Sequence, residues 1–378
     1  MAESNIINHA ARILKLVQAG TPADLALRES LVQSRHFTAP GERRGISRAV
    51  FTYFRWWRWL DQKDSLQKQL EAALAVQDRF NQDPASIKAE ALTALAVPDW
   101  LKAEMDTIPT DWLRQLQREP PLWIRAKQGL GGKVSASLGS CAPAALPQFP
   151  ALGSQLSALR YSNLTDLYRT PEFQAGEFEI QDLASQLVSH ACNPQPGETW
   201  WDACAGEGGK TMHLSDLMKN KGLLWASDRS KRRLDKLKER AARAKVFNFR
   251  TAPWEGGAHL PTKGKFNGIL IDAPCSGVGT WQRNPHARWT TTPKDVKELA
   301  VVQLGLLNHA AGSLKPNGRL IYAVCTLTRA ETTAVADAFT AAHPELTPTP
   351  VLGQTPQLTL WPHELTANGM FLAAWTKR

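Results

Sequence analysis

From about residue 176 to the end of the chain, short apolar runs alternate with stretches of helical character, and most of these runs end in small or polar residues. The runs are "ETWWDAC", "GLLWASD", "VFNFRTA", "FNGILIDAPC", "GRLIYAVCTL" and "NGMFLAAW". Strands that alternate with helices form a parallel sheet, because a crossover must carry the chain back between parallel neighbours. We therefore predict a doubly wound α/β domain over residues 176–378, with its chemistry at the carboxyl ends of the strands.

The first 95 residues show the apolar spacing of helices, and we predict an all-helical domain over residues 1–95. One of its helices carries an aromatic stripe, formed by Tyr53, Trp56, Trp57 and Leu60. The arginines of the same segment form a basic face that we expect to contact RNA: Arg43, Arg44, Arg48, Arg55 and Arg58. The alternative is a solvated face with no ligand, because charged helix faces are common on soluble proteins.

Residues 96–175 have mixed character, and we predict a small α+β domain there. Two short helices precede a strand around Leu122–Ala126. The following stretch, "GGKVSASLGSCAPAALPQFPALG", is rich in Gly, Ala and Pro, and we predict it to be loops.

The charge balance favours a polyanionic partner, with nucleic acid first. The 378 residues carry a formal net charge of +10 and have a pI of about 9.4. A generally basic proteome would give the same balance, so charge alone does not identify the partner. No apolar run approaches the roughly 18 residues of a membrane span, and the first twenty residues lack the apolar centre of a signal peptide. We expect a soluble, cytoplasmic protein with five free thiols.

The glycine-rich turn "DACAGEGGKT" offers three interpretations. A phosphate-binding P-loop needs glycine where Cys204 stands, and a dinucleotide fingerprint needs it where Thr211 stands. The remaining interpretation is the S-adenosyl-L-methionine loop of class I methyltransferases, in which Asp228, ending the next strand, accepts the ribose hydroxyls. The spacing to Asp228 suits NAD as well. The predicted cofactor-binding residues are Cys204, Ala205, Gly206, Glu207, Gly208, Gly209, Lys210, Asp228 and Asp272.

Two cysteines follow two strands that would be neighbours in such a sheet, Cys275 inside "DAPC" and Cys325 inside "AVCT". Either one alone is typical of a small buried hydrophobe. Together they suit covalent catalysis on cytosine, because a thiolate that adds to carbon 6 makes carbon 5 nucleophilic. Lys210 is a candidate to favour the thiolate, and Asp272 a candidate to hold the polar edge of the base.

The motifs "DACAGEGGKT", "DAPCSGVGTWQRNPHARW" and "LIYAVCTLTRAE" together resemble those of Sun-type RNA (cytosine-5) methyltransferases. The chain is most similar to the bacterial ribosomal RNA enzymes with a NusB-like N-terminal domain. The resemblance is good over residues 98–378, and in the N-terminal region it is limited to the layout and "PGERRGISRAVFTYFRWW". It implies that Cys325 is the nucleophile and that Cys275 helps to release the product. It also implies that the loop from Cys204 to Lys210, with Asp228 and Asp272, lines the cofactor and base site.

The chain departs from the family pattern at several positions. Gly206 and Glu207 stand where the family has Ala-Pro, which adds a negative charge near the expected cofactor. The acid that follows the third strand, thought to meet the adenine, is missing from "RTAPW". His286 replaces an acid in "RNPHARW", and Thr332 replaces the asparagine after Glu331.

We expect a methyltransferase that forms 5-methylcytosine in RNA, with ribosomal RNA as the substrate, acting as a monomer and holding no metal. One alternative is a non-catalytic RNA-binding or ribosome-assembly factor, which the presence of both cysteines disfavours. A second is a small-molecule methyltransferase, which the basic N-terminal region disfavours. A DNA-type enzyme is a third, but the Glu-Asn-Val that accompanies its Pro-Cys nucleophile is absent.

Overall fold

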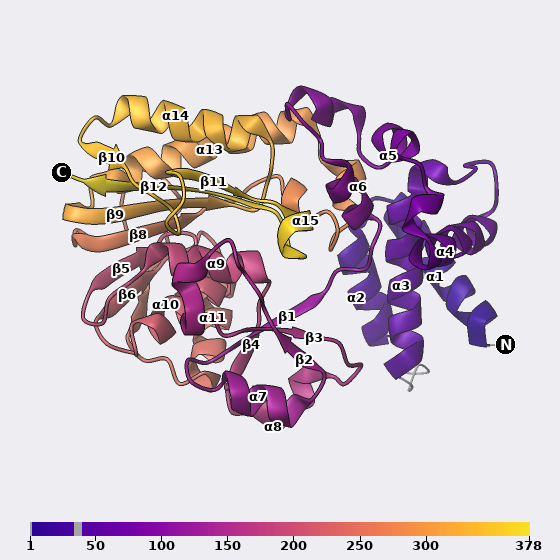
Figure 1. Ribbon diagram of the computed structural model, residues 1–378, viewed down its shortest axis with the longest axis horizontal. Coiled ribbons are helices and arrows are strands. Elements are labelled where there is room, and N and C mark those ends of the chain that lie inside the picture. Colours follow the sequence, from indigo (N-terminus) through magenta and orange to yellow (C-terminus); the bar gives the residue numbers. More distant parts are fainter. Residues whose placement is uncertain (1, 34–39) are drawn as a thin grey trace. The chain divides into compact units, whose positions relative to one another are not determined.

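The computed structural model describes residues 2–33 and 40–378, which divide into two compact units (Figure 1). Unit 1 comprises Met1–Pro120 and Thr280–Thr292, and unit 2 comprises Pro121–Gly279 and Pro293–Arg378. The segment 280–292 therefore leaves one unit to join the other. The division at residues 95 and 175 that we drew from the sequence stays a prediction. None of the described helices is both long and apolar enough to cross a membrane.

Unit 1 is helical over its described residues, as predicted. Its helices are α1 (Ala2–Gln18), α2 (Ala23–Gln33), α3 (Pro40–Trp56), α4 (Leu66–Gln82), α5 (Ala89–Leu95), α6 (Thr110–Leu116) and the short α12 (Ala287–Thr290). The aromatic stripe of α3 faces the core, where the Trp56 ring packs on Phe80 at 5.4 Å between centroids. Its indole Nε1 donates to Gln77 Oε1 on α4 at 3.0 Å, so this buried polar group is satisfied.

The basic face expected on α3 needs one correction, because Arg55 is buried with only 2% of its surface exposed. The segment 280–292 covers this end of α3, and Trp289 Nε1 donates to the carbonyl of Phe54 at 2.7 Å. Arg288 is also fully buried there and donates to the carbonyls of Ala96 and Leu116, both at 3.0 Å. A segment more than 220 residues away thus removes Arg55 from the face predicted to meet RNA.

Unit 2 contains a small antiparallel sheet with the strand order β2-β3-β1-β4. The strands are β1 (Leu122–Ala126), β2 (Cys141–Pro143), β3 (Ala158–Tyr161) and β4 (Phe178–Ile180), with the short helix α8 (Pro171–Gln174) before the last. The prediction that the Gly/Ala/Pro-rich stretch is all loop was wrong, because it forms α7 (Gly131–Leu138) and β2. Val134 of α7 is fully buried in the core of this sheet, so tertiary packing outweighs the weak local propensity.

The main sheet of unit 2 has eight strands, in the order β10-β12-β9-β8-β5-β6-β7, with β11 paired to β12. The parallel strands are β5 (Thr199–Asp202), β6 (Leu223–Ala226), β7 (Phe249–Thr251), β8 (Phe266–Asp272) and β9 (Leu314–Val324). The antiparallel ones are β10 (Leu346–Pro348), β11 (Gln357–Leu360) and β12 (Met370–Lys377). The predicted doubly wound sheet is confirmed, and β8 lies between β5 and β9 as expected.

The crossover helices are α9 (Leu183–Cys192), α10 (Gly209–Leu217), α11 (Lys231–Arg243), α13 (Pro293–Ala311) and α14 (Thr333–Ala342), and the short α15 (Pro362–Leu365) precedes β12. Leu234, Leu237 and Ala241 of α11 are buried, as its spacing predicted. Its charges are not all on a solvated face, because Arg240 and Arg243 both form ion pairs with the buried Glu179 of β4. The small sheet is thereby tied to the main sheet within unit 2.

Candidate active site

The two cysteines singled out in the sequence meet at the carboxyl edge of the main sheet. β8 and β9 are paired in parallel as far as Asp272 and Ala323, so both strands end at the same level. Cys275 follows three residues after β8 and Cys325 one residue after β9. Their sulfur atoms lie 3.3 Å apart, within hydrogen-bonding distance for two thiols.

The contact between the thiols makes them chemically different. Burial and the hydrogen bond to Cys325 raise the pKa of Cys275 well above its ordinary value, so this sulfur keeps its proton. The same hydrogen bond lowers the pKa of Cys325, and the ammonium of Lys210 acts in the same direction. Burial and the Asp272 carboxylate oppose this shift, but the net direction is downward. The arrangement therefore favours a thiolate on Cys325 that accepts a hydrogen bond from the Cys275 thiol.

Lys210 and Asp272 form an ion pair beside the thiols, with Lys210 Nζ 2.6 Å from Asp272 Oδ2. Lys210 projects from the first turn of α10, and Asp272 is the last residue of β8. Burial lowers the pKa of Lys210, but the Asp272 carboxylate more than offsets this and holds the pKa above its ordinary value. The lysine is thus charged and fixed in place, and the second oxygen of Asp272 has no partner among the printed contacts of the described residues.

Glu331 joins the two cysteine-bearing loops, although its side chain is fully buried. Its carboxylate accepts from the backbone amide of Ser276 at 2.8 Å and also from the Ser276 hydroxyl. On the other loop it accepts from the hydroxyls of Thr326 at 3.2 Å and Thr328 at 2.8 Å. Gln303 of α13 adds a further donor at 3.0 Å. Because Ser276 follows Cys275 and Thr326 follows Cys325, one carboxylate sets the spacing of both thiols.

A cavity of about 780 Å³ opens beside Cys275 at this edge of the sheet. The turn after β5 forms one wall, and Asp228, which follows β6, forms another. The Asp228 carboxylate accepts from the amides of Gly206 at 3.0 Å and Ser230 at 2.8 Å, so it is fixed against the turn. Gly208 has a φ of 84°, and a Cβ there would overlap the Leu237 side chain, so this turn requires glycine.

The cavity gathers most, but not all, of the residues predicted to bind a cofactor. Those that line it are Cys204, Ala205, Gly206, Glu207, Asp228 and Asp272. Gly208, Gly209 and Lys210 do not line it and belong to the start of α10 behind the turn. Of the predicted catalytic residues Cys275 and Asp272 border the cavity, whereas Cys325 and Lys210 reach it only through their contacts with those two.

Two features of the site were missed in the sequence. Trp254 and Glu255 line the cavity, directly after the segment "RTAP" from which the expected acid is missing. The signal was an acid one position beyond the quoted "RTAPW". Glu331 was noted only as part of a family pattern, and nothing local in the sequence indicates that it is buried between two loops.

The donor set suits an organic cofactor rather than a metal. Two carboxylates, Asp228 and Glu255, lie on the wall of an elongated cavity together with backbone of the turn, which fits hydroxyl and amino groups of a nucleoside. Among the residues that the structure describes, no three His, Cys, Asp or Glu side chains gather as a metal site would require.

Comparison with known proteins agrees with this geometry. A family model described as 16S rRNA methyltransferase RsmB/F matches residues 189–376. A probable ribosomal RNA small subunit methyltransferase B of Synechocystis sp. is 32% identical over 307 residues, which cover 73% of this chain and 66% of that protein. Its counterpart in Bacillus subtilis is 35% identical over 219 residues, which cover 54% of this chain and 49% of that protein. The chain thus spans about half to two thirds of the length of these curated relatives.

Solved structures show the same fold at lower sequence identity. The crystal structure of PH0851 has a TM-score of 0.78 and 22% identity, and the match covers 100% of this chain and 99% of that one. NSun6 from Pyrococcus horikoshii, determined with the S-adenosylmethionine analogue SFG, has a TM-score of 0.62 and 20% identity over 74% of this chain and 97% of that one. The expected methyltransferase fold is thereby confirmed.

Proposed function

The chain belongs to the RsmB/F family of 16S rRNA methyltransferases, and from this premise we propose that it transfers a methyl group from S-adenosyl-L-methionine to carbon 5 of a cytosine in ribosomal RNA. The observation that carries the proposal is the thiol pair at the carboxyl edge of the sheet, with Cys275 and Cys325 3.3 Å apart. A small-molecule methyltransferase has no need of two thiols in contact. A binding protein has no need of a pair with oppositely shifted pKa values.

We assign the attack on the base to Cys325. Its thiolate forms a bond to carbon 6 of cytosine, and the electrons of the 5,6 double bond make carbon 5 nucleophilic. Lys210 supports the thiolate, and Asp272, held by Lys210, has an oxygen with which to hold the polar edge of the base.

We assign the release of the product to Cys275. After methylation, carbon 5 still carries a proton, which must leave before the bond between carbon 6 and Cys325 can break. Cys275, deprotonated at that stage, takes this proton while the electron pair of the carbon–sulfur bond returns to Cys325. The result is a protonated Cys275 beside a Cys325 thiolate, which is the state that the pKa shifts of the pair favour.

The residues along the cavity fit S-adenosyl-L-methionine, which when bound supplies a methyl group on a sulfonium centre. In this proposal Asp228 holds the ribose hydroxyls, and the turn from Cys204 to Glu207 follows the amino-acid end. Glu255 takes the place of the family's acid after the third strand, because it lines the cavity and follows β7 by four residues. The hydrogen bonds of Asp228 to the turn support its role, since they hold an ionised acceptor in position.

The partner in this proposal is ribosomal RNA, on which a bacterial enzyme of this family acts in the cytoplasm as a monomer. The helical residues 1–95 serve as a NusB-like RNA-binding domain, residues 96–175 as a linking domain, and residues 176–378 as the methyltransferase. The net charge of +10 supports an RNA partner.

The proposal is tested by bisulfite sequencing of ribosomal RNA from cells with and without this gene. We expect one cytosine to lose its methylation without the gene and to regain it when the natural gene is restored, but not the gene for Cys325→Ala. Methylation that is unchanged at every ribosomal cytosine would overturn the assignment.

A further inference from the structure

The loops at the amino-terminal edge of the parallel strands, opposite the thiols, include two turns that are locked together. One lies between α10 and β6 and the other between α11 and β7. Asn220 of the first turn accepts from the amide of Phe247 at 3.0 Å and donates to the carbonyl of Lys245 at 2.8 Å. Asn248 donates back to the carbonyl of Lys221 at 3.3 Å. The two turns therefore form one rigid platform.

This platform carries cations and an exposed aromatic ring. Lys219, Lys221 and Lys245 are all exposed, and none of them has an ion-pair partner among the described residues. Phe247 stands between them in the chain order and has 76% of its surface exposed. An exposed phenylalanine beside unpaired lysines is costly to solvate, and it is the combination with which proteins stack a base and hold its phosphate.

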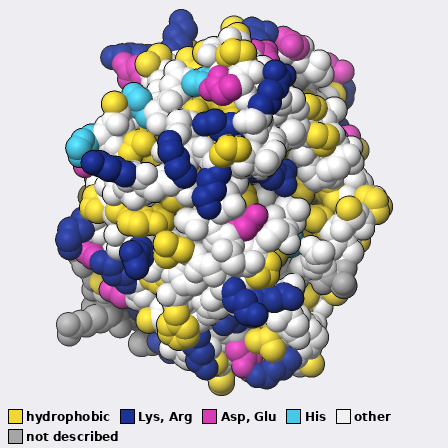
Figure 2. All heavy atoms as spheres, turned by 90° about the vertical axis from the view of Figure 1, so that its left-hand side faces the viewer, with side chains coloured by type: hydrophobic (Ala, Val, Ile, Leu, Met, Phe, Trp, Pro, Cys, Tyr) yellow, Lys and Arg dark blue, Asp and Glu magenta, His cyan; other side chains and the backbone are white. Residues whose placement is uncertain are grey.

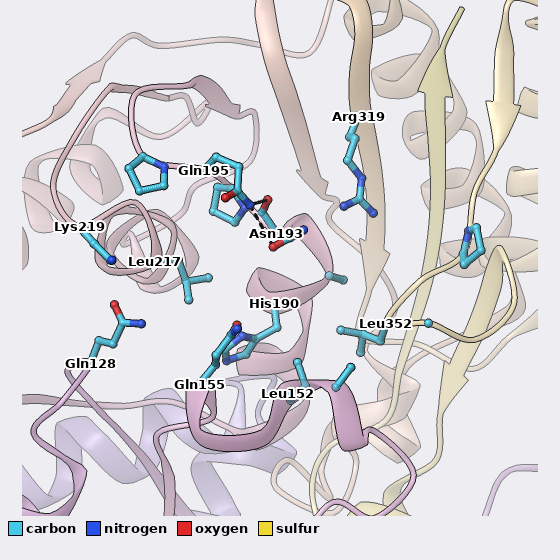
Figure 3. A pocket seen from close by; sticks show the side chains of 16 residues that line it. Gln128, Leu152, Gln155, His190, Asn193, Gln195, Leu217, Lys219, Arg319 and Leu352 are labelled. Carbon is cyan, nitrogen blue, oxygen red and sulfur yellow. Dashed lines mark hydrogen bonds between the residues drawn. The ribbon is translucent and has the colours of Figure 1, made fainter.

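The same surface continues into a cavity of about 500 Å³ (Figure 3). Lys219 and Arg319 lie on opposite sides of this cavity, with His190 of α9 between them. The His190 ring is 7% exposed, and neither of its nitrogens has a hydrogen-bond partner in the described structure, although the ring packs on His213. A buried imidazole that lacks a partner and lines a cavity is available to a ligand.

The electrostatics of this edge favour an anion. The polar side chains that line the cavity are amides, one imidazole and two cations, and no Asp or Glu is found among its described lining residues. The amino ends of the parallel strands face the viewer in Figure 2, where Lys and Arg side chains spread over the face and reach its centre. A neutral ligand would leave these charges uncompensated, whereas a phosphodiester backbone would pair with them.

We propose that Lys219, Lys221, Lys245, Phe247 and Arg319 form a second RNA-binding surface, the amino-edge surface, that holds a single-stranded segment of the substrate RNA outside the active site. A base stacks on Phe247, the lysines contact the flanking phosphates, and the chain continues past Lys219 into the cavity toward Arg319. The inference rests on the proposed function, since it takes RNA as the substrate. It adds a contact surface at the opposite edge of the sheet from the chemistry.

The test compares RNA binding by the natural protein with that of the double variant Lys221→Glu/Lys245→Glu and of Phe247→Ala. The probe is a fluorescent single-stranded fragment of ribosomal RNA, titrated at several salt concentrations. We expect the double variant to bind on the order of tenfold or more weakly, with a salt slope smaller by about 1.4, because each lost contact to single-stranded RNA removes about 0.7. Phe247→Ala should bind roughly 5- to 150-fold more weakly, which is the range for one stacked base.

The matched control is Lys231→Glu/Lys238→Glu, which changes the charge equally on the exposed face of α11. All of these side chains are exposed, so melting temperatures should stay unchanged, and the rate at saturating RNA should also be unaffected. Affinity that is the same as in the natural protein, or that falls equally in the control, would overturn the amino-edge surface. So would weaker binding of a mononucleotide with RNA binding unchanged. If the natural protein neither binds nor methylates RNA, the proposed function itself fails.

Discussion

The sulfur atoms of Cys275 and Cys325 lie 3.3 Å apart although 50 residues separate them in the chain. Two elements produce this contact. The parallel pairing of β8 with β9 brings the two strand ends to one level, and Glu331 ties the residue after each cysteine to the same carboxylate. The contact makes one sulfur a hydrogen-bond donor and the other an acceptor, so the two thiols cannot exchange roles without a rearrangement of their protons.

The first prediction separates the roles of the two thiols. Cys325→Ala removes the nucleophile, so both methylation and any covalent complex with RNA should be lost. Cys275→Ala should still attack the base and accept the methyl group but should fail to release the product. A protein–RNA adduct should therefore accumulate, visible as a shifted band on a denaturing gel. An adduct in Cys325→Ala and none in Cys275→Ala would make Cys275 the nucleophile instead.

The second prediction concerns pH. Because the Cys275 thiol lowers the pKa of Cys325, Cys275→Ala should raise that pKa and leave less thiolate at any given pH. The rate at which iodoacetamide labels Cys325, followed by mass spectrometry of its peptide, should then reach half of its maximum at a higher pH. Cys275→Ser keeps a donor and should shift the profile less. A profile that moves to lower pH in Cys275→Ala would contradict the direction of the hydrogen bond.

Much of this site could be predicted from the sequence, because local patterns determine it. Buried parallel strands appear as apolar runs, and a doubly wound sheet places the ends of neighbouring strands together. Cys275, Cys325, Asp228 and Asp272 all follow such runs, so their common edge was predictable.

The features that were missed depend on contacts between distant segments. Arg55 has the helical spacing of an exposed residue, and only the segment 280–292 buries it. Glu331 resembles an ordinary surface acid, and its role depends on donors from Ser276 and Gln303, which lie 55 and 28 residues away. Helix α7 forms despite its glycines because Val134 fits the core of the small sheet. No periodicity within one segment carries this information.

The third prediction tests Glu331 as a positioning residue. In Glu331→Gln the amide nitrogen cannot accept, so at least one of the buried donors around it loses its partner. We expect the free energy of unfolding to fall by about 2–3 kcal/mol in a denaturant titration, since this is a buried hydrogen bond to a charged group. Because the thiols would separate, kcat should fall more than KM rises. Glu345→Gln, at an exposed acid, is the control and should change stability by less than about 0.5 kcal/mol. Equal effects of the two variants would remove Glu331 from the site.

The fourth prediction concerns the cofactor cavity. Asp228→Ala should weaken the binding of S-adenosyl-L-methionine by about 2–3 kcal/mol, because charge-assisted hydrogen bonds are lost. Asp228→Asn keeps one acceptor and should show a smaller loss. Glu255→Gln should cost about 1 kcal/mol if Glu255 replaces the missing acid. Calorimetry gives the affinities, and melting curves show whether each variant is folded. Unchanged affinity in Asp228→Ala would exclude this residue from the ribose site.

The last prediction distinguishes the arginines of α3. Arg44 is exposed and suited to contact RNA, so Arg44→Glu should weaken RNA binding and reduce its salt dependence. Arg55 is buried, and its Nε and Nη1 have no hydrogen-bond partner in the described structure. Burial lowers the pKa of Arg55 to about 10, which reflects the cost of holding its charge there. Arg55→Met should therefore leave RNA affinity unchanged and should not lower the melting temperature, because it replaces a buried, poorly paired charge by a side chain of similar volume. If Arg55→Met weakens RNA binding while Arg44→Glu does not, the RNA-contacting face of unit 1 has been assigned to the wrong side of α3.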